Sequence, residues 1–243
     1  MTVVEHLDEL RTRLVIAIGA IGLGSIGGWF LFGPVTRLLE NPYCAFMNAH
    51  PNLAADPKDP CKLVFLGVAE PFLLKLKVTV FLGLALALPI VLYELWRFIT
   101  PGLTERERRY GLPFVFCSVL LFVLGGWFAL ITLPKGLNFL LGFAGSDRVL
   151  LLLTFPRYLS FVMLMILAFG VSFEFPLVLI SLTLVGILSS RKLRDVRRYA
   201  ILGIAVFAAV ITPSQDWFTM TAMMVPLILF YELAIIVARL LRK

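Results

Sequence analysis

Apolar residues in this chain are gathered into long runs that are separated by shorter polar segments. The runs carry almost no charge, which is typical of helices that cross a lipid bilayer. The pattern predicts spans at about 14–32, 72–98, 110–133, 158–184, 199–211 and 217–237. The expected fold class is therefore an all-α integral membrane protein with six transmembrane helices, in one polytopic domain over residues 1–243.

Polar residues and helix breakers predict the connections between these spans. Residues 33–70 are rich in Pro, Asn and Asp, and we expect them to form a long external loop. Pro176 should bend the fourth span because it removes a helical hydrogen bond. The fifth span ends at Thr212-Pro213 after covering only about 20 Å, against about 30 Å of hydrocarbon. We therefore expect the fifth and sixth spans to form a short pair.

The N-terminus joins an amphipathic segment to the first apolar span. Leu7, Leu10 and Leu14 recur at helical spacing. A segment over residues 2–13 with this pattern would lie at the membrane surface before the chain enters the bilayer. The apolar run that follows is too long for a cleavable signal peptide and lacks a small-residue cleavage site, so we expect it to remain as a helix.

Composition and charge agree with a membrane protein. Hydrophobic residues make up 60% of the 243 residues and charged residues 15%, and the mean hydropathy is +0.96. The net charge of +7 does not indicate nucleic acid, because the basic residues lie between apolar spans. Lys and Arg divide fourteen to eight in favour of the side that holds both termini, which predicts that the N and C termini face the cytoplasm.

The three cysteines fall in two environments. Cys44 and Cys61 share the expected external loop, where an oxidising compartment would allow a disulfide, although two free thiols would give the same sequence. Cys117 lies inside the third span and is expected to be a small core residue.

Motifs of known enzymes and metal sites are missing from the sequence. It contains two His, with no His-Glu-x-x-His, Gly-x-Ser-x-Gly or P-loop motif, so we expect no catalysis, no metal and no cofactor. The candidate functional residue inside the membrane is Glu174, because a carboxylate at this depth should face protein or water. Either it is a neutral acid bonded to a neighbouring helix, or it forms a polar site on a concave face used by a partner helix.

Glu9 and Glu107 form a second pair of candidates at the cytoplasmic surface. Each carboxylate can accept two hydrogen bonds from one guanidinium, so neighbouring carboxylates could recognise paired arginines better than paired lysines. A structural role is the alternative. Glu9 is four residues before Arg13 and can pair with it, and Glu107 can close a capping box with Thr104. Spacing alone favours the structural roles.

Five segments resemble the twin-arginine protein translocase subunit TatC family. They are residues 6–14 (HLDELRTRL), 93–109 (YELWRFITPGLTERERR), 158–176 (YLSFVMLMILAFGVSFEFP), 191–199 and 212–216 (TPSQD). The resemblance covers nearly the whole chain in order, and it is weakest in the external loop. The sequence departs from the shorter form of the family by one extra residue between Pro213 and Asp216, and by Met220 where that form has glutamine.

This resemblance implies a receptor for signal peptides that carry paired arginines. Such a receptor assembles with single-span partners of the TatA and TatB types, self-associates in the complex, and moves folded proteins across the bacterial cytoplasmic membrane using the proton-motive force. By position, the resemblance assigns signal-peptide binding to Glu9, Arg11, Phe98 and Glu107. It assigns the intramembrane polar site for a partner helix to Glu174 and Thr212, and the external loop after the fifth span to Asp216.

A small proton-coupled secondary transporter, with Glu174 as its intramembrane site, is the alternative function. Such transporters often contain inverted repeats, and the two halves of this sequence show none, which weakens the transporter hypothesis.

Overall fold

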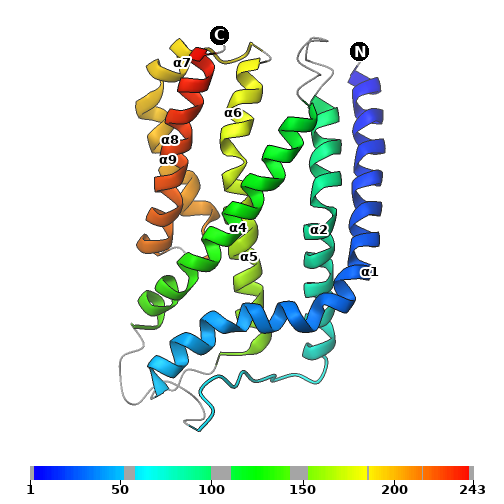
Figure 1. Ribbon diagram of the computed structural model, residues 1–243, viewed down its shortest axis with the longest axis vertical. Helices are drawn as coiled ribbons and strands as arrows, with labels where there is room; N and C mark the ends of the chain where they lie inside the picture. The colour runs from blue at the N-terminus through cyan, green and yellow to red at the C-terminus, as the bar shows by residue number, and fades with distance from the viewer. Residues whose placement is uncertain are drawn as a thin grey trace.

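The computed structural model describes residues 3–51, 58–99, 111–142, 153–184, 186–214 and 216–240. These residues form a helical bundle (Figure 1). The helices are α1 (Val3–Ala49), α2 (Glu70–Ile99), α4 (Gly111–Gly142), α5 (Phe155–Phe173), α6 (Phe175–Leu184), α7 (Ser190–Asp195), α8 (Arg197–Ile211) and α9 (Trp217–Leu240). The predicted all-α membrane fold is confirmed.

Five stretches in the described part of the chain are long and apolar enough to cross a membrane. They are Leu7–Ala49, Glu70–Phe98, Gly111–Leu140, Phe155–Leu184 and Trp217–Leu240. The expected fifth span corresponds to α8, whose 15 residues are shorter than any of these. Helix α9 has 24 residues and is long enough to cross a membrane, so the expectation of a short sixth span was wrong.

Helix α1 is longer than the first apolar run and changes direction. Figure 1 shows its first part running along the bundle and its second part lying across the lower end. Pro34 lies inside the helix and removes one backbone hydrogen bond, which accounts for a bend. The predicted loop over residues 33–70 was therefore wrong for residues 33–49. These residues stay helical because Leu39, Tyr43, Phe46 and Met47 repeat at helical spacing and are buried.

The fourth predicted span is interrupted at Glu174, as Pro176 led us to expect. Helix α5 ends at Phe173 and α6 begins at Phe175, while the backbone N–H of Glu174 donates to the carbonyls of Val171 and Ser172. The interruption places the Glu174 side chain at a break within an otherwise continuous apolar segment of 30 residues.

Two large buried clusters hold most of the helices together. One joins residues 34–49 of α1, which we call the outer part of α1, to α2, α4 and α5. It includes Tyr43, Met47, Val78, Leu133 and Leu159. The other joins α4, α5 and α9 and includes Met165, Phe169, Met223, Leu227 and Tyr231. Phe161 and Ile166 of α5 pack against both clusters, so α5 connects the two halves of the bundle.

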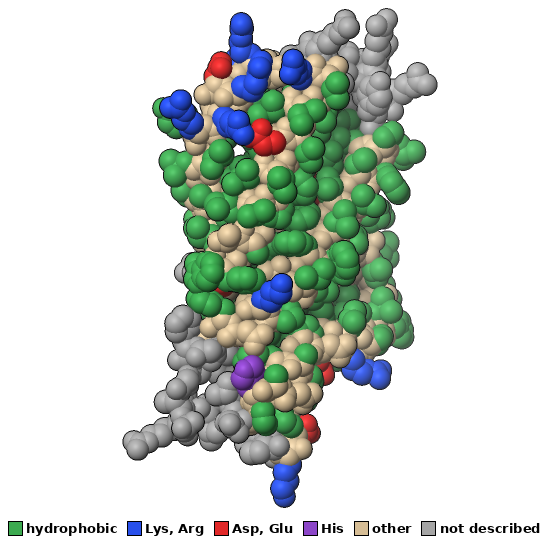
Figure 2. Space-filling view, turned by 60° about the vertical axis from the view of Figure 1, so that its left-hand side comes forward, with side chains coloured by type: hydrophobic (Ala, Val, Ile, Leu, Met, Phe, Trp, Pro, Cys, Tyr) green, Lys and Arg blue, Asp and Glu red, His purple; other side chains and the backbone are tan. Residues whose placement is uncertain are grey.

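The surface separates into an apolar belt and charged ends. Figure 2 shows hydrophobic side chains over the middle of one face, with charged side chains gathered mainly beyond the two ends of the belt. The start of α1 and the end of α9 lie at the same end of the bundle (Figure 1). Basic residues of α7 and α9, including Lys192, Arg194 and Arg239, occur near that end.

Candidate functional site

An ion-pair cluster joins the first turns of α1 to the last turns of α2. The Arg13 guanidinium donates from one terminal nitrogen to Glu94 Oε2 at 2.9 Å and from the other to Glu9 Oε1 at 3.2 Å. The side chains of Arg13, Glu9 and Glu94 are only 16%, 20% and 8% exposed. This end of the α1–α2 pair therefore holds two carboxylates and one guanidinium, mostly shielded from solvent.

Helix geometry and close packing bring these three side chains together. Glu9 and Arg13 are four residues apart on α1 and so lie on one face. Glu94 comes from α2, 81 residues from Arg13 in the sequence. The two helices approach closely because glycines meet at their interface: a Cβ on Gly24 would lie 2.6 Å from the Gly83 carbonyl oxygen.

Two polar atoms of the cluster lack a hydrogen-bond partner among the described residues. Glu9 Oε2 and Arg13 Nε are buried and have no hydrogen-bond partner within the described part of the protein. Two carboxylates against one guanidinium leave one uncompensated negative charge. A buried acceptor next to an excess negative charge favours an added cationic donor, and a guanidinium is well suited to such a carboxylate.

An apolar groove adjoins the cluster. It has a volume of about 170 Å³ and is lined by Arg13 and Glu94 together with Leu10, Leu14, Leu95 and Phe98. Phe98 therefore lies beside Arg13 and Glu94, the hydrogen-bond neighbours of the Glu9 site. Arg11 is exposed on the neighbouring face of α1. Glu107 and Thr104 lie outside the described residues.

Glu94 was missed by sequence reasoning. It lies inside the segment 93–109, but it is 81 residues from Arg13, and so large a separation does not indicate that the two side chains pair. The available signal was a carboxylate followed by Leu95 and Trp96 near the end of an apolar run, where an unpaired charge would be costly.

Glu174 occupies a separate site farther along the bundle. Ser118 Oγ of α4 donates to Glu174 Oε2 at 2.5 Å, while Glu174 Oε1 is buried without a partner among the described residues. Glu174 also lines a cavity of about 300 Å³ between α2, α4 and α6, with Trp96, Leu177 and Ser181. The carboxyl group is thus bonded to a neighbouring helix on one side and faces a mostly apolar hollow on the other.

Thr212 and Asp216 lie at the turn between α8 and α9. Thr212 is 1% exposed, directly follows the last residue of α8, and donates from its hydroxyl to the Ala208 carbonyl at 2.8 Å. Asp216 accepts from the Thr219 backbone N–H at 2.8 Å, so it caps the first turn of α9. Among the described residues, Thr212 and Glu174 therefore share no hydrogen-bond partner, and Thr212 and Asp216 each bond within the α8–α9 turn.

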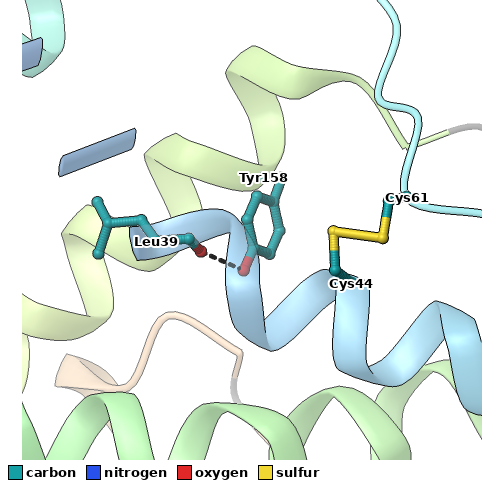
Figure 3. Close-up of a disulfide and its surroundings, with 4 residues drawn as sticks. All are labelled: Leu39, Cys44, Cys61 and Tyr158. Carbon is teal, nitrogen blue, oxygen red and sulfur yellow. Dashed lines mark hydrogen bonds between the residues drawn. A yellow bond between two sulfur atoms is a disulfide. The ribbon is translucent and has the colours of Figure 1, made fainter. Parts of the chain in front are cut away.

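A disulfide joins Cys44 of α1 to Cys61, with their Cα atoms 4.7 Å apart (Figure 3). Close to it, the Tyr158 hydroxyl of α5 donates to the Leu39 carbonyl of α1 at 2.8 Å (Figure 3). These contacts fix the outer part of α1 against both the following segment and α5. No group of three His, Cys, Asp or Glu that could hold a metal occurs in the part of the chain described here.

Known proteins resemble this chain over nearly its whole length. Residues 5–226 match the sequence model of the family described as Sec-independent protein translocase protein (TatC). The protein of that name from Frankia casuarinae is 44% identical over 240 residues, which are 98% of this chain and 65% of the relative. The protein from Aquifex aeolicus is 36% identical over 243 residues, which are 99% of this chain and 95% of the relative.

Solved structures agree with this likeness. A crystal structure of the twin-arginine translocase receptor TatC in DDM matches with a TM-score of 0.77 and 35% identity, covering 96% of this chain and 99% of that one. A second crystal structure of the receptor matches with a TM-score of 0.76 and 35% identity, covering 98% and 100%. The chain spans less than two thirds of the length of the relatives from Frankia casuarinae and Corynebacterium kroppenstedtii, 65% and 60% respectively.

Proposed function

Because this chain belongs to the TatC family of Sec-independent protein translocase proteins, we propose that it is the receptor and core subunit of a twin-arginine export system. In this proposal it binds signal peptides with paired arginines at the membrane face that holds Glu9, which we assign to the cytoplasm. It assembles with single-span TatA- and TatB-type partners in a bacterial inner membrane. Transport of folded cargo then uses the proton-motive force.

The observation that carries this proposal is the unsatisfied Glu9 Oε2 next to a groove that contains Phe98. An arginine of the signal peptide would donate to this oxygen, while apolar residues near it in the peptide would contact the groove. Lysine would bind less well, because an ammonium cannot make the paired, planar contact of a guanidinium. Selectivity for arginine would thus come from geometry as much as from charge.

Arg13 sets the charge of this site in the proposal. The Arg13 guanidinium bonds to both Glu9 and Glu94, so it neutralises Glu9 only in part. Glu9 therefore keeps negative charge with which it can bind the peptide. In a Glu94→Gln variant, Arg13 would pair with Glu9 alone, and peptide affinity should fall. In an Arg13→Gln variant, the peptide arginine no longer competes with Arg13 for Glu9, and the affinity for the peptide should rise. If the cluster has only a structural role, both variants should bind the peptide more weakly.

The test is the affinity of the full-length purified protein for a signal peptide with Arg-Arg or Lys-Lys, measured by site-specific crosslinking from α1. Replacing Glu9 by Ala should weaken Arg-Arg binding by about 1.5–3 kcal/mol, the usual contribution of a hydrogen bond to a charged group. Asp8→Ala is the matched control, because Asp8 is an exposed acid on the adjacent face. Equal binding of the two peptides, or an equal loss in the control, would contradict the proposal.

Glu174 serves partner assembly in this proposal. Its buried, unpartnered Oε1 and the cavity beside it offer an acceptor to a polar side chain of a single-span partner helix. Loss of the carboxyl group should therefore disrupt assembly with the partner and leave signal-peptide binding unchanged.

A further inference from the structure

A second groove lies on the side of the bundle formed by α1, α2 and α5, away from both Glu9 and Glu174. It has a volume of about 400 Å³. Two helical stripes with spacing i, i+3, i+4, i+7 form its walls: Lys77, Val80, Phe81 and Leu84 on α2, and Ser160, Met163, Leu164 and Leu167 on α5. Ile21 of α1 completes it. We call these residues the α2–α5 groove.

One end of the α2–α5 groove is basic. Lys77 Nζ donates to Ser160 Oγ at 2.9 Å, which uses one of the three N–H donors of the ammonium. Arg157 lies one turn before Ser160 and extends the α5 stripe beyond the groove. Lys77 and Arg157 are both exposed, and within the described chain neither forms a salt bridge. The groove therefore ends in two positive charges that lack a counter-charge.

The basic end has the features of the level at which a bilayer changes from hydrocarbon to headgroups. Lys77 is about 10 Å along α2 from its start at Glu70. Beside it, Lys75 Nζ lies 3.9 Å from the centre of the Trp29 ring. Tryptophan and lysine gather at the membrane interface, because their apolar parts are buried while their polar tips reach the headgroups. The rest of the groove extends from this level towards the membrane centre.

We propose that the α2–α5 groove binds an anionic phospholipid, with its phosphate between Lys77 and Arg157 and an acyl chain along the apolar stripes. The arrangement matches such a lipid in both charge and polarity. Basic pockets between membrane helices bind anionic headgroups on the cytoplasmic side, and the same chemistry is available at this opposite end of the bundle. A partner helix fits less well. An apolar transmembrane helix laid on these stripes would leave Lys77 and Arg157 without a counter-charge, whereas a lipid phosphate supplies one.

The test is native mass spectrometry of the delipidated, full-length protein titrated with phosphatidylglycerol or with phosphatidylcholine of the same acyl chains. Affinity for phosphatidylglycerol should fall about fivefold for each basic residue removed in Lys77→Gln and Arg157→Gln. Affinity for phosphatidylcholine should change little. Lys75→Gln is the matched control, because it removes the same charge two residues away on another face of α2.

Three results would overturn the proposal: equal binding of the two lipids, an equal loss of affinity in Lys75→Gln, or unchanged binding in the Lys77→Gln/Arg157→Gln double variant. A photoreactive residue in place of Leu84 gives an independent readout in native membranes. A lipid adduct at this position supports the assignment, and a protein adduct there would replace it with a helix-docking surface. Unchanged thermal stability of each variant shows that binding was tested on folded protein.

Discussion

At the scale of single residues, Asp216 shows how a polar side chain stabilises the end of a membrane helix. It is 7% exposed. Burial alone would raise the pKa of this carboxyl, but the opposing hydrogen bonds from Ser214, Thr219 and the N–H groups of Thr219 and Phe218 lower the pKa overall. The folded protein therefore favours the ionised form, which holds the first turn of α9.

Removing this cap should destabilise the folded protein. Asp216→Ala should lower the free energy of unfolding by about 1 kcal/mol at neutral pH, as for other lost N-caps. Because the folded pKa lies below the unfolded value, this stabilisation is complete above about pH 4 and is lost as the pH falls through the folded pKa. The difference between variant and native protein should therefore shrink in acid.

Thermal unfolding in mild detergent at several pH values checks this prediction. Thr221→Ala is the control, because the Thr221 hydroxyl bonds to the Trp217 carbonyl within α9 and caps nothing. A constant difference between Asp216→Ala and the native protein from neutral pH down to pH values below the folded pKa would show that the ionised carboxylate contributes nothing to stability.

At the scale of helices, the pairing of α1 with α2 depends on glycines. A Cβ on Gly83 would lie 2.7 Å from the Ser25 nitrogen and 2.8 Å from the Ile21 carbonyl oxygen. A Cβ on Gly28 would lie 2.7 Å from the Thr79 carbonyl oxygen. These obstacles are backbone atoms, so the helices would have to move apart to admit a methyl group. This close approach also places Glu94 within reach of Arg13.

We expect Gly83→Ala to destabilise the protein and to separate Arg13 from Glu94. Gly22→Ala is the matched control, because nothing lies within 4 Å of a Cβ at that position. Thermal unfolding should show a lower melting temperature for Gly83→Ala only. Disulfide crosslinking between cysteines placed at residues 13 and 94 measures the separation directly. If both alanine variants melt alike, close glycine packing does not hold α1 against α2.

The helices differ in how well the sequence predicted them. Pro176 correctly indicated the break between α5 and α6, and the short apolar run before Thr212-Pro213 correctly indicated a short α8. Residues 33–49 were missed because Pro34 and Pro42 suggested a loop, although both are tolerated inside α1. The pairing of Arg13 with Glu94 was not predictable, because it depends on the packing of two helices and not on local spacing.

At the scale of the whole molecule, the outer part of α1 closes one end of the bundle. Its buried residues join the cluster shared by α2, α4 and α5, and the disulfide attaches it to the segment that leads into α2. Tyr158 adds a hydrogen bond from α5. One helix therefore forms both a wall of the bundle and the cover of its lower end (Figure 1).

Removing the disulfide should destabilise this cover. The bond joins residues 17 apart, and closing a loop of this size contributes about 3 kcal/mol. Cys44→Ser/Cys61→Ser should therefore melt at a lower temperature than the native protein, and a reductant should lower the melting temperature of the native protein only. Cys117→Ser is the control, since Cys117 is a free cysteine. It is exposed on α4, so the expectation that it is a core residue was wrong. A native protein that melts identically with and without reductant would contradict this prediction.

The anchored outer part of α1 also constrains the opposite side of the membrane. From Gly33 to Glu9 the helix rises about 36 Å, at 1.5 Å for each residue. A continuous helix held at one end resists sliding along its own axis, so its far end stays at a constant height. The disulfide and the Tyr158 hydrogen bond therefore hold Glu9 at a constant height along the bundle, although they act at its opposite end.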